Sequence, residues 1–456
     1  MKALLIIHDN YQEDNHFPIA AGYVASELIN EGVEVEVYCM DIYHYTNKQL
    51  AEKLKKEEYD FIGLGFFAAR YTETIKDLCK IINRYKKKAW FVLGGYGPSP
   101  IPEFMLEDTE CDAVVVGEFE NVVKTIVHDK EENNNRRIYR AKPIKKLDEV
   151  PFPAWDIFPM DIYKKNIVMA GMKAKDRYMN MVTSRGCVNK CAFCYRMEKG
   201  IRVRSIENIV EEIYQLNKRF GTNFIEFSDE CYVLNKKRVE EFAQALEERN
   251  LNIQYWCASR VNVIDEEMLE LLKRSGCKFI NYGFESMDLQ VLKGMNKNTT
   301  PEQNENAAKL TREAGIPFGL NFLWCNPYDT KETLWKNVEF IKKYNTYQHI
   351  RNIRPVTPFP GCDLYYYAIN KGLISGPEDF FNKFKNSDMI MVNFTDMSLD
   401  DMYKELYKAN GELIKDHFKH TNGDMDEANF HIESLRKVYF EGDITFRGLR
   451  HYERKI

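Results

Sequence analysis

The chain has 456 residues, of which 29% are charged, and its formal net charge is −5. This length allows two or three domains at about 150 residues each, and the mild acidity argues against a nucleic-acid surface, because phosphate recognition needs a basic face. No apolar run reaches the roughly 18 residues of a membrane span. The opening "MKALLIIHDN" lacks the long apolar core and cleavage site of a signal peptide.

The chain contains 11 cysteines, an odd number that is scattered over a long sequence. Such a distribution is not a disulfide framework and indicates a reducing compartment. We therefore expect a cytoplasmic protein.

Residues 1–142 alternate short apolar runs with helical patterns. Strands are predicted at "KALLIIH", "VEVEVY", "DFIGLGFF", "AWFVLGG" and "DAVVVGE", with a helix from Ile19 to Asn30. Near-continuous apolar strands that alternate with helices predict an α/β domain with a doubly wound parallel sheet. Ligands of such sheets bind at the carboxyl ends of the strands, where residues 65–71 and 94–99 are expected.

A polar stretch and then four prolines, between Pro143 and Pro159, interrupt this pattern. Such a composition predicts an exposed hairpin or loop that leads into an interdomain linker. We assign this linker to residues 143–176.

The alternation resumes near Tyr178, and residues 177–375 are predicted to form a second domain. Its strands are expected at "YMNMVTSRG", "FIEFSDE", "IQYWCASR", "FINYGFES", "FGLNFLW" and "IRNIRPVTPF". Ser205 is a predicted helix N-cap, and helices are expected to end near Gly276 and Gly315. Six units of roughly 30 residues suit a partial (β/α)6 TIM-type barrel, whose chemistry lies on the loops after the strands.

Residues 376–456 give a mainly helical pattern. Ser398 and Asp401 resemble a capping box ahead of the apolar stripe that begins at Met402. We interpret this region as a C-terminal helical subdomain or lid.

Three closely spaced cysteines, Cys187, Cys191 and Cys194, follow the first barrel strand in "TSRGCVNKCAFCYR". Core cysteines are an alternative, although the Arg, Gly, Asn and Lys neighbours are unusual for a core. Structural zinc normally has four ligands, and no second CxxC pair is present. A redox CxxC pair leaves Cys187 unexplained. A four-iron cluster on three thiolates instead leaves one iron open, so that a small molecule can chelate it.

The CxxxCxxC spacing at this place in a partial barrel resembles the radical S-adenosylmethionine (SAM) family. The resemblance implies an oxygen-sensitive [4Fe-4S] cluster on the three cysteines and SAM on the open iron. It also implies reductive cleavage of SAM to methionine and a 5′-deoxyadenosyl radical. An electron donor such as flavodoxin or ferredoxin is then expected.

The same resemblance implies a set of SAM contacts at the ends of the strands. For each of them the alternative is an ordinary polar side chain that faces water. The implied contacts are Phe193 near the adenine, Ser228, Asp229 and Glu230 at the amino group, Arg260 at the carboxylate, Glu285 and Ser286 at the ribose, and Asn321 in the same site.

Cys325 departs from the family pattern. After the fifth strand the family usually has a glycine-rich turn, whereas this chain has "FLWCNPYDT". One interpretation is a cysteine that is tolerated in a tight turn. The other is a catalytic cysteine that faces the reaction chamber, where it contacts substrate or donates a hydrogen atom to a radical.

The first domain resembles the cobalamin-binding domain that many radical SAM proteins carry, on "FPIAAGYVASELINEGVEVEVYCMD" and "LGGYGPSPIPEFMLEDTECDAVVVGEFE". Gly94 and Gly95 allow a large planar ligand to approach the backbone closely. The DxHxxG signature is absent, which implies a cobalamin without a histidine ligand, and Arg70 or Tyr71 is expected near the lower cobalt face. Alternatively, these two residues fill the cavity together with Phe66 and Phe67, and no cobalamin binds.

The two resemblances together imply a cobalamin-dependent methyltransferase that acts on an unactivated carbon of a small molecule or natural product. One SAM supplies the methyl group through cobalamin, and a second SAM supplies the radical. The alternatives are ring formation, dehydration, epimerisation or rearrangement, and a sensor without turnover. Residues 325–456 are expected to shape the substrate site.

Overall fold

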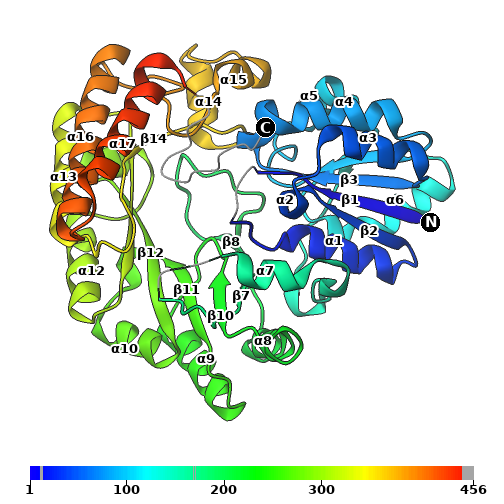
Figure 1. Ribbon diagram of the computed structural model, residues 1–456, viewed down its shortest axis with the longest axis horizontal. Coiled ribbons are helices and arrows are strands. Elements are labelled where there is room, and N and C mark those ends of the chain that lie inside the picture. Colours follow the sequence, from blue (N-terminus) through cyan, green and yellow to red (C-terminus); the bar gives the residue numbers. More distant parts are fainter. Residues whose placement is uncertain (11–13, 168, 170, 444–456) are drawn as a thin grey trace.

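The computed structural model describes residues 1–10, 14–167, 169 and 171–443. Two six-stranded parallel sheets lie side by side (Figure 1). The chain between them is mostly irregular with one short helix, and the chain after the second sheet is largely helical. The prediction of an α/β protein with two parallel sheets and C-terminal helices is therefore confirmed. The exact domain boundaries remain predictions.

The N-terminal sheet, sheet A, has the strand order β2-β1-β3-β4-β5-β6. Its topological switch point lies between β1 and β3, where the strand order reverses. The first five strands match the predicted apolar runs. The strands are β1 (Lys2–Ile7), β2 (Glu34–Cys39), β3 (Phe61–Gly65), β4 (Trp90–Gly94), β5 (Ala113–Val116) and β6 (Ile138–Arg140).

Strand β6 corrects the prediction of a loop or hairpin in this part of the chain. Its three residues pair in parallel with β5, and Tyr139 between them is buried. The polar residues on either side of "IYR" hide this strand in the sequence, because a single buried side chain makes no visible period.

Helices cover both faces of sheet A. Ala3 and Leu5 pack with α1 (Ile19–Asn30) and α6 (Val123–Glu131). Leu4 and Ile6 point the other way, as alternate strand residues do. They pack in the second core with α3, α4 and α5. The remaining helices here are α2 (Met40–Tyr43), α3 (Asn47–Lys56), α4 (Lys76–Tyr85) and α5 (Pro102–Thr109).

The second sheet, sheet B, is a half-barrel with the order β14-β13-β12-β11-β10-β7. Its strands all run parallel, as predicted for six βα units. The strands are β7 (Tyr178–Met181), β10 (Phe224–Phe227), β11 (Gln254–Ser259), β12 (Cys277–Glu285), β13 (Phe318–Trp324) and β14 (Arg354–Pro355).

Helices pack against the outer face of sheet B, and their predicted ends are confirmed. The Ser205 side chain accepts from the Asn208 backbone N–H at the start of α8. Gly276 and Gly315 follow two of the helices with φ values of 98° and 73°. The helices of this region are α8 (Ile206–Phe220), α9 (Lys236–Glu248), α10 (Glu266–Arg274), α11 (Leu289–Gly294), α12 (Pro301–Glu313) and α13 (Lys331–Tyr344).

The predicted first barrel strand is divided into two pieces. β7 ends at Met181, and β8 (Ser184–Cys187) pairs antiparallel with β9 (Gly200–Val203) outside sheet B. The cysteine loop therefore lies between the strands of a short hairpin.

The C-terminal region contacts both halves of the protein (Figure 1). The Phe381 ring lies 4.5 Å from the Tyr71 ring of the N-terminal region. On the other side, Trp335 of α13 donates to Glu405 at 3.1 Å. Ser398 caps the following helix, as predicted. The helices are α14 (Asp363–Asn370), α15 (Pro377–Lys383), α16 (Leu399–His420) and α17 (Met425–Arg436), and α7 (Met160–Asn166) precedes β7.

Within the described part of the chain, no helix is long and apolar enough to cross a membrane. Residues 444–456, which belong to the aromatic C-terminal region expected to shape the substrate site, lie outside the described residues.

Candidate active site

The cysteine loop lies at the carboxyl edge of sheet B. Cys187 ends β8, and Cys191 and Cys194 follow in the loop to β9. The loop is held in place by the segment after α11, because the Ala192 backbone N–H donates to the Met295 carbonyl at 2.8 Å. The three thiols are thus carried by one hairpin at the edge where barrels place their chemistry.

The surroundings of Cys191 favour its thiolate. A hydrogen bond from Cys194 lowers the pKa of Cys191 to about 6, with the cations Lys297 and Arg260 adding to the effect and burial opposing it. The same hydrogen bond and burial raise the pKa of Cys194. Thiolates are the form in which cysteine binds iron–sulfur clusters.

The three thiols are the donor type that an iron–sulfur cluster takes. Among the described residues, no group of three or more His, Cys, Asp or Glu side chains is arranged to hold one metal ion. A four-iron cluster takes each thiolate on a different iron, so its cysteines need not converge on one point.

A buried ion pair lies beside the cysteines. The Lys297 ammonium is 2.8 Å from the Glu285 carboxylate, and the two side chains are only 8% and 9% exposed. Lys297 also lies 6.0 Å from the Phe193 ring. Sequence analysis identified Glu285 and Phe193 but not Lys297, because a single lysine in a loop carries no pattern.

The backbone at Glu285 is strained. Its φ is 65°, and the pairing of β12 with β13 shifts register between Gly283 and Glu285. A left-handed conformation at a non-glycine residue costs free energy and persists only where the surrounding structure enforces it. This backbone conformation directs the Glu285 carboxylate toward the Lys297 ammonium.

Arg260 follows β11 and joins this group. Its guanidinium donates to the carbonyls of Lys297 and Asn298, the second at 3.2 Å, and lies 4.0 Å from the Cys191 sulfur. Arg260 thereby fixes the loop that carries Lys297 and leaves a cation next to the cysteines.

Two of the predicted SAM contacts are engaged inside the protein. Asp229 is 5% exposed and accepts from the backbone N–H groups of Thr183 and Ser184 at 2.7 and 2.8 Å. Ser286 has no exposed surface, and its hydroxyl accepts from the Asp288 N–H. These contacts indicate that both residues shape the loops rather than face a ligand. Their neighbours Ser228 and Glu230 are exposed.

Cys325 also differs from the prediction that it faces the reaction chamber. It has no exposed surface and belongs to the core, and its φ is 70°. Burial raises the pKa of its thiol well above the ordinary value. These observations agree with the alternative of a cysteine tolerated in a tight turn.

The rim of sheet A has an open, glycine-lined edge. Gly65 and Gly94 are in register at the ends of β3 and β4. A Cβ built on Gly94 meets no atom within 4 Å, and Gly95 has a φ of 91°. Phe67 beside them is 66% exposed. This open edge fits a large planar ligand such as cobalamin.

Tyr71 was predicted near the lower cobalt face, but it does not line this edge. It is 1% exposed, stacks against Phe66 and donates to Asp108. Arg70 is partly exposed. Burial lowers the pKa of His8 to about 4, and the charge of Arg70 adds to the effect, so His8 is neutral at the rim.

The rims of the two sheets meet at Tyr96, which follows Gly95. The Tyr96 hydroxyl donates to Glu230 at 3.0 Å, across from sheet A to sheet B. Its ring stacks on Phe67 at 5.8 Å and meets Tyr195 of the cysteine loop edge-on at 5.9 Å. Loops from both sheets are therefore joined at one residue.

A second link holds the cysteine hairpin to sheet A. Arg202 of β9 donates to both oxygens of Glu118, at 2.7 and 2.9 Å. Arg185 of β8 donates to Glu120 at 2.6 Å. Burial of Glu118 would raise its pKa, but the arginines outweigh burial and lower it.

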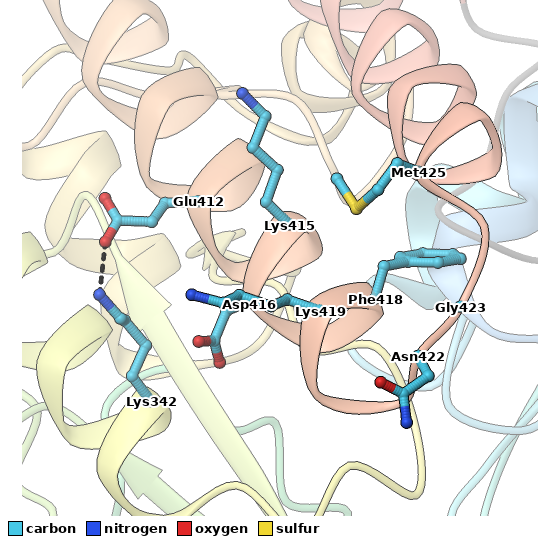
Figure 2. A pocket seen from close by; sticks show the side chains of 9 residues that line it. All are labelled: Lys342, Glu412, Lys415, Asp416, Phe418, Lys419, Asn422, Gly423 and Met425. Atoms are coloured by element: carbon cyan, nitrogen blue, oxygen red, sulfur yellow. Dashed lines mark hydrogen bonds and ion pairs between the residues drawn. The ribbon is translucent and has the colours of Figure 1, made fainter.

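A groove of about 590 Å³ lies elsewhere, between α13, α16 and α17 (Figure 2). Lys342 faces Glu412 across it at 2.6 Å. None of the predicted site residues lines this groove, so its size alone does not mark it as the active site.

Comparison with protein families gives two matches. Residues 181–341 match the Radical SAM superfamily, and residues 10–127 match the B12 binding domain. The two stretches contain the cysteine hairpin and the glycine-lined rim, respectively.

Individual proteins resemble the chain over most of its length. An uncharacterized methyltransferase of Pyrococcus horikoshii is 29% identical over 93% of this chain and 94% of its own. An anaerobic magnesium-protoporphyrin IX monomethyl ester cyclase of Rubrivivax gelatinosus is 26% identical over 79% and 69%. TsrM, a radical SAM methyltransferase of Kitasatospora setae solved with cobalamin and a [4Fe-4S] cluster, has a TM-score of 0.63 at 19% identity over 81% and 75%. This last match supports the fold.

Proposed function

The chain belongs to the radical SAM superfamily and carries a B12-binding domain, and from this we propose that it is a cobalamin-dependent methyltransferase acting on an unactivated carbon of a small molecule. The observation that carries the proposal is the contact between the two rims. The Tyr96–Glu230 hydrogen bond brings the glycine-lined edge of sheet A to the cysteine-bearing edge of sheet B. A substrate carbon held at this junction would lie beside both proposed cofactor sites.

Cys187, Cys191 and Cys194 would hold the [4Fe-4S] cluster, which supplies the electron that cleaves SAM. Arg260, beside the Cys191 sulfur, is suited to the SAM carboxylate, because guanidinium and carboxylate form strong paired hydrogen bonds. Glu230 is exposed at the same edge and is suited to the SAM ammonium group.

Gly94 and Gly95 would line the cobalamin site, and cobalamin supplies the methyl group to the substrate carbon. A carbon without an acidic proton does not react with SAM by polar chemistry, which is why a radical and a second cofactor belong together. An external reductant of the flavodoxin or ferredoxin type is the expected electron source.

The proposal is tested on protein reconstituted anaerobically with iron, sulfide and hydroxocobalamin. A corrinoid absorbance band should remain after desalting, and dithionite should cause SAM cleavage to 5′-deoxyadenosine. With substrate, S-adenosylhomocysteine and 5′-deoxyadenosine should form in equal amounts along with methylated product.

Two results would contradict the proposal. Loss of the corrinoid band on desalting would remove cobalamin from the reaction. Formation of 5′-deoxyadenosine without S-adenosylhomocysteine would point to another radical outcome, such as the ring formation named for one relative.

A further inference from the structure

Two asparagine side chains project from the inner face of the half-barrel, below the rim. On β12, Ile280 and Tyr282 pack in the core with the outer helices, so Asn281 between them points inward. On β13, Leu320 and Phe322 are outward-facing in the same way, so Asn321 points inward. Both asparagines are exposed although they lie in the middle of the sheet. The half-barrel is therefore open at this level.

The orientation of both amide groups follows from one backbone carbonyl. The Asn321 Nδ2 donates to the Tyr282 carbonyl oxygen at 2.7 Å, and a carbonyl can only accept. The same Nδ2 donates to the Asn281 Oδ1 at 2.8 Å. The Asn281 oxygen must therefore face Asn321. This leaves the Asn281 Nδ2 as a donor and the Asn321 Oδ1 as an acceptor, and neither has a partner among the described residues.

A glycine makes this arrangement possible. Gly319 is the inward-facing neighbour of Asn281 on β13. A Cβ at Gly319 would lie 2.0 Å from the Asn281 Oδ1. Any side chain there would displace the Asn281 amide and break its bond with Asn321. The glycine in this strand therefore keeps the space that the Asn281 amide occupies.

The pair borders the residues assigned to SAM and continues away from the rim. Asn321 is in register with Gly283, where a Cβ would lie 2.3 Å from the Glu285 carboxylate and 2.8 Å from the Lys297 ammonium. Asn281 lies two residues before Gly283 on the same strand. A molecule that reaches from the rim into the half-barrel would place its far end against the two amides.

We propose that Asn281 and Asn321 recognise an amide edge of the substrate, an N–H next to a C=O, as in a lactam, a cyclic imide or a primary carboxamide. The substrate carbonyl accepts from the Asn281 Nδ2, and the substrate N–H donates to the Asn321 Oδ1. The assignment rests on the proposed function, because it names the substrate class of that site. It assigns Asn321 to the substrate, whereas the family resemblance implies a SAM contact for this residue.

The test uses three small six-membered-ring probes with different hydrogen-bonding edges. 2-Piperidone presents an acceptor and a donor, N-methyl-2-piperidone presents only the acceptor, and 2-iminopiperidine, a cation at neutral pH, presents two donors. Binding to the cluster-reconstituted protein is measured by ligand-observed NMR. The wild-type protein should bind 2-piperidone about five- to tenfold more tightly than its N-methyl analogue, the ratio expected for one hydrogen bond.

The variant Asn281→Asp separates recognition from folding. Its carboxylate still accepts from Asn321, but the free donor becomes an acceptor. The variant should lose the preference for 2-piperidone and prefer 2-iminopiperidine. Asn382→Asp, an exposed change on α15, is the matched control for added charge and should keep the wild-type order.

The proposal is overturned if 2-piperidone does not bind, if its N-methyl analogue binds equally well, or if Asn281→Asp leaves the order of the probes unchanged. These outcomes are independent of turnover. Corrinoid retention and SAM cleavage in the same preparation show separately whether the proposed function holds.

Discussion

Tyr96 of sheet A donates a hydrogen bond of 3.0 Å to Glu230 of sheet B. Partial desolvation at the rim raises the pKa of Glu230 although its side chain is exposed, and this hydrogen bond counteracts the rise by stabilising the carboxylate. Tyr96 thus favours the charged form of the carboxylate at the junction of the two rims.

The variant Tyr96→Phe removes this hydrogen bond and should raise the pKa of Glu230 further. If the carboxylate binds the SAM ammonium group, the acid limb of the pH–rate profile for SAM cleavage will move to higher pH. One hydrogen bond corresponds to a shift of about half to one pH unit. Tyr195→Phe, in the neighbouring ring, should leave the limb in place. An unshifted limb in Tyr96→Phe would exclude this role.

Alanine at Cys187, Cys191 or Cys194 should abolish the cluster. Each variant should lose the broad absorbance of the reconstituted protein and most of its iron, and SAM cleavage should fall by roughly a hundredfold or more. The control is Cys362→Ser, a buried helix N-cap whose sulfur accepts from the Tyr365 N–H. Serine is a preferred cap, so this variant should keep its iron. Full iron content in the Cys191 variant would disprove the ligand assignment.

Lys297→Met should destabilise the protein strongly, because it leaves the Glu285 carboxylate buried without its partner. The expected loss is roughly 3–5 kcal/mol in the free energy of unfolding, measured by urea titration of cofactor-free protein. Adding Glu285→Gln should restore part of this loss, since the unpaired charge is then removed. An additive double variant would show that the two residues are not coupled.

Arg351, unlike Lys297, is a cation without a carboxylate partner among the described residues. Its Nε is buried without an acceptor, and the guanidinium donates to the Phe318 carbonyl at 3.3 Å and lies 5.9 Å from the Phe279 ring. Burial lowers its pKa to about 10. Arg351→Met should raise the free energy of unfolding by about 1 kcal/mol, because it removes a partly buried charge that none of the ion pairs among the described residues neutralises.

The control for Arg351 is Arg204→Met. Arg204 is buried and paired with Glu212, so its loss should cost roughly 3 kcal/mol or more. If both variants lose stability equally, a negatively charged group must neutralise Arg351, and the prediction is wrong.

The strands and the cysteine loop were predictable because their signals are local. An apolar run such as "AWFVLGG" needs no distant partner to indicate a buried strand. The cap at Ser205 and the stops at Gly276 and Gly315 likewise depend on backbone geometry within one turn.

The roles of single polar residues were less predictable, because they depend on contacts between distant parts of the chain. Asp229 and Glu230 are adjacent and both acidic, yet one is buried under the Thr183–Ser184 backbone and the other is exposed. Tyr71 looked suited to a ligand, but the C-terminal Phe381 covers it. The role of Lys297 could not be predicted, because it depends on an ion pair with Glu285 that forms only in the folded protein.

The ion pairs that hold the cysteine hairpin to the N-terminal domain matter if the two halves of the protein are separated. Arg185 and Arg202 lie on the β8–β9 hairpin, but the carboxylates that neutralise them, Glu118 and Glu120, lie in the segment after β5 of the N-terminal domain. A half-barrel expressed alone would carry two stranded positive charges at the base of its cluster loop. Separation would therefore cost little in charge burial, because water solvates exposed guanidinium groups, but it would remove the contacts that hold the cluster loop in position.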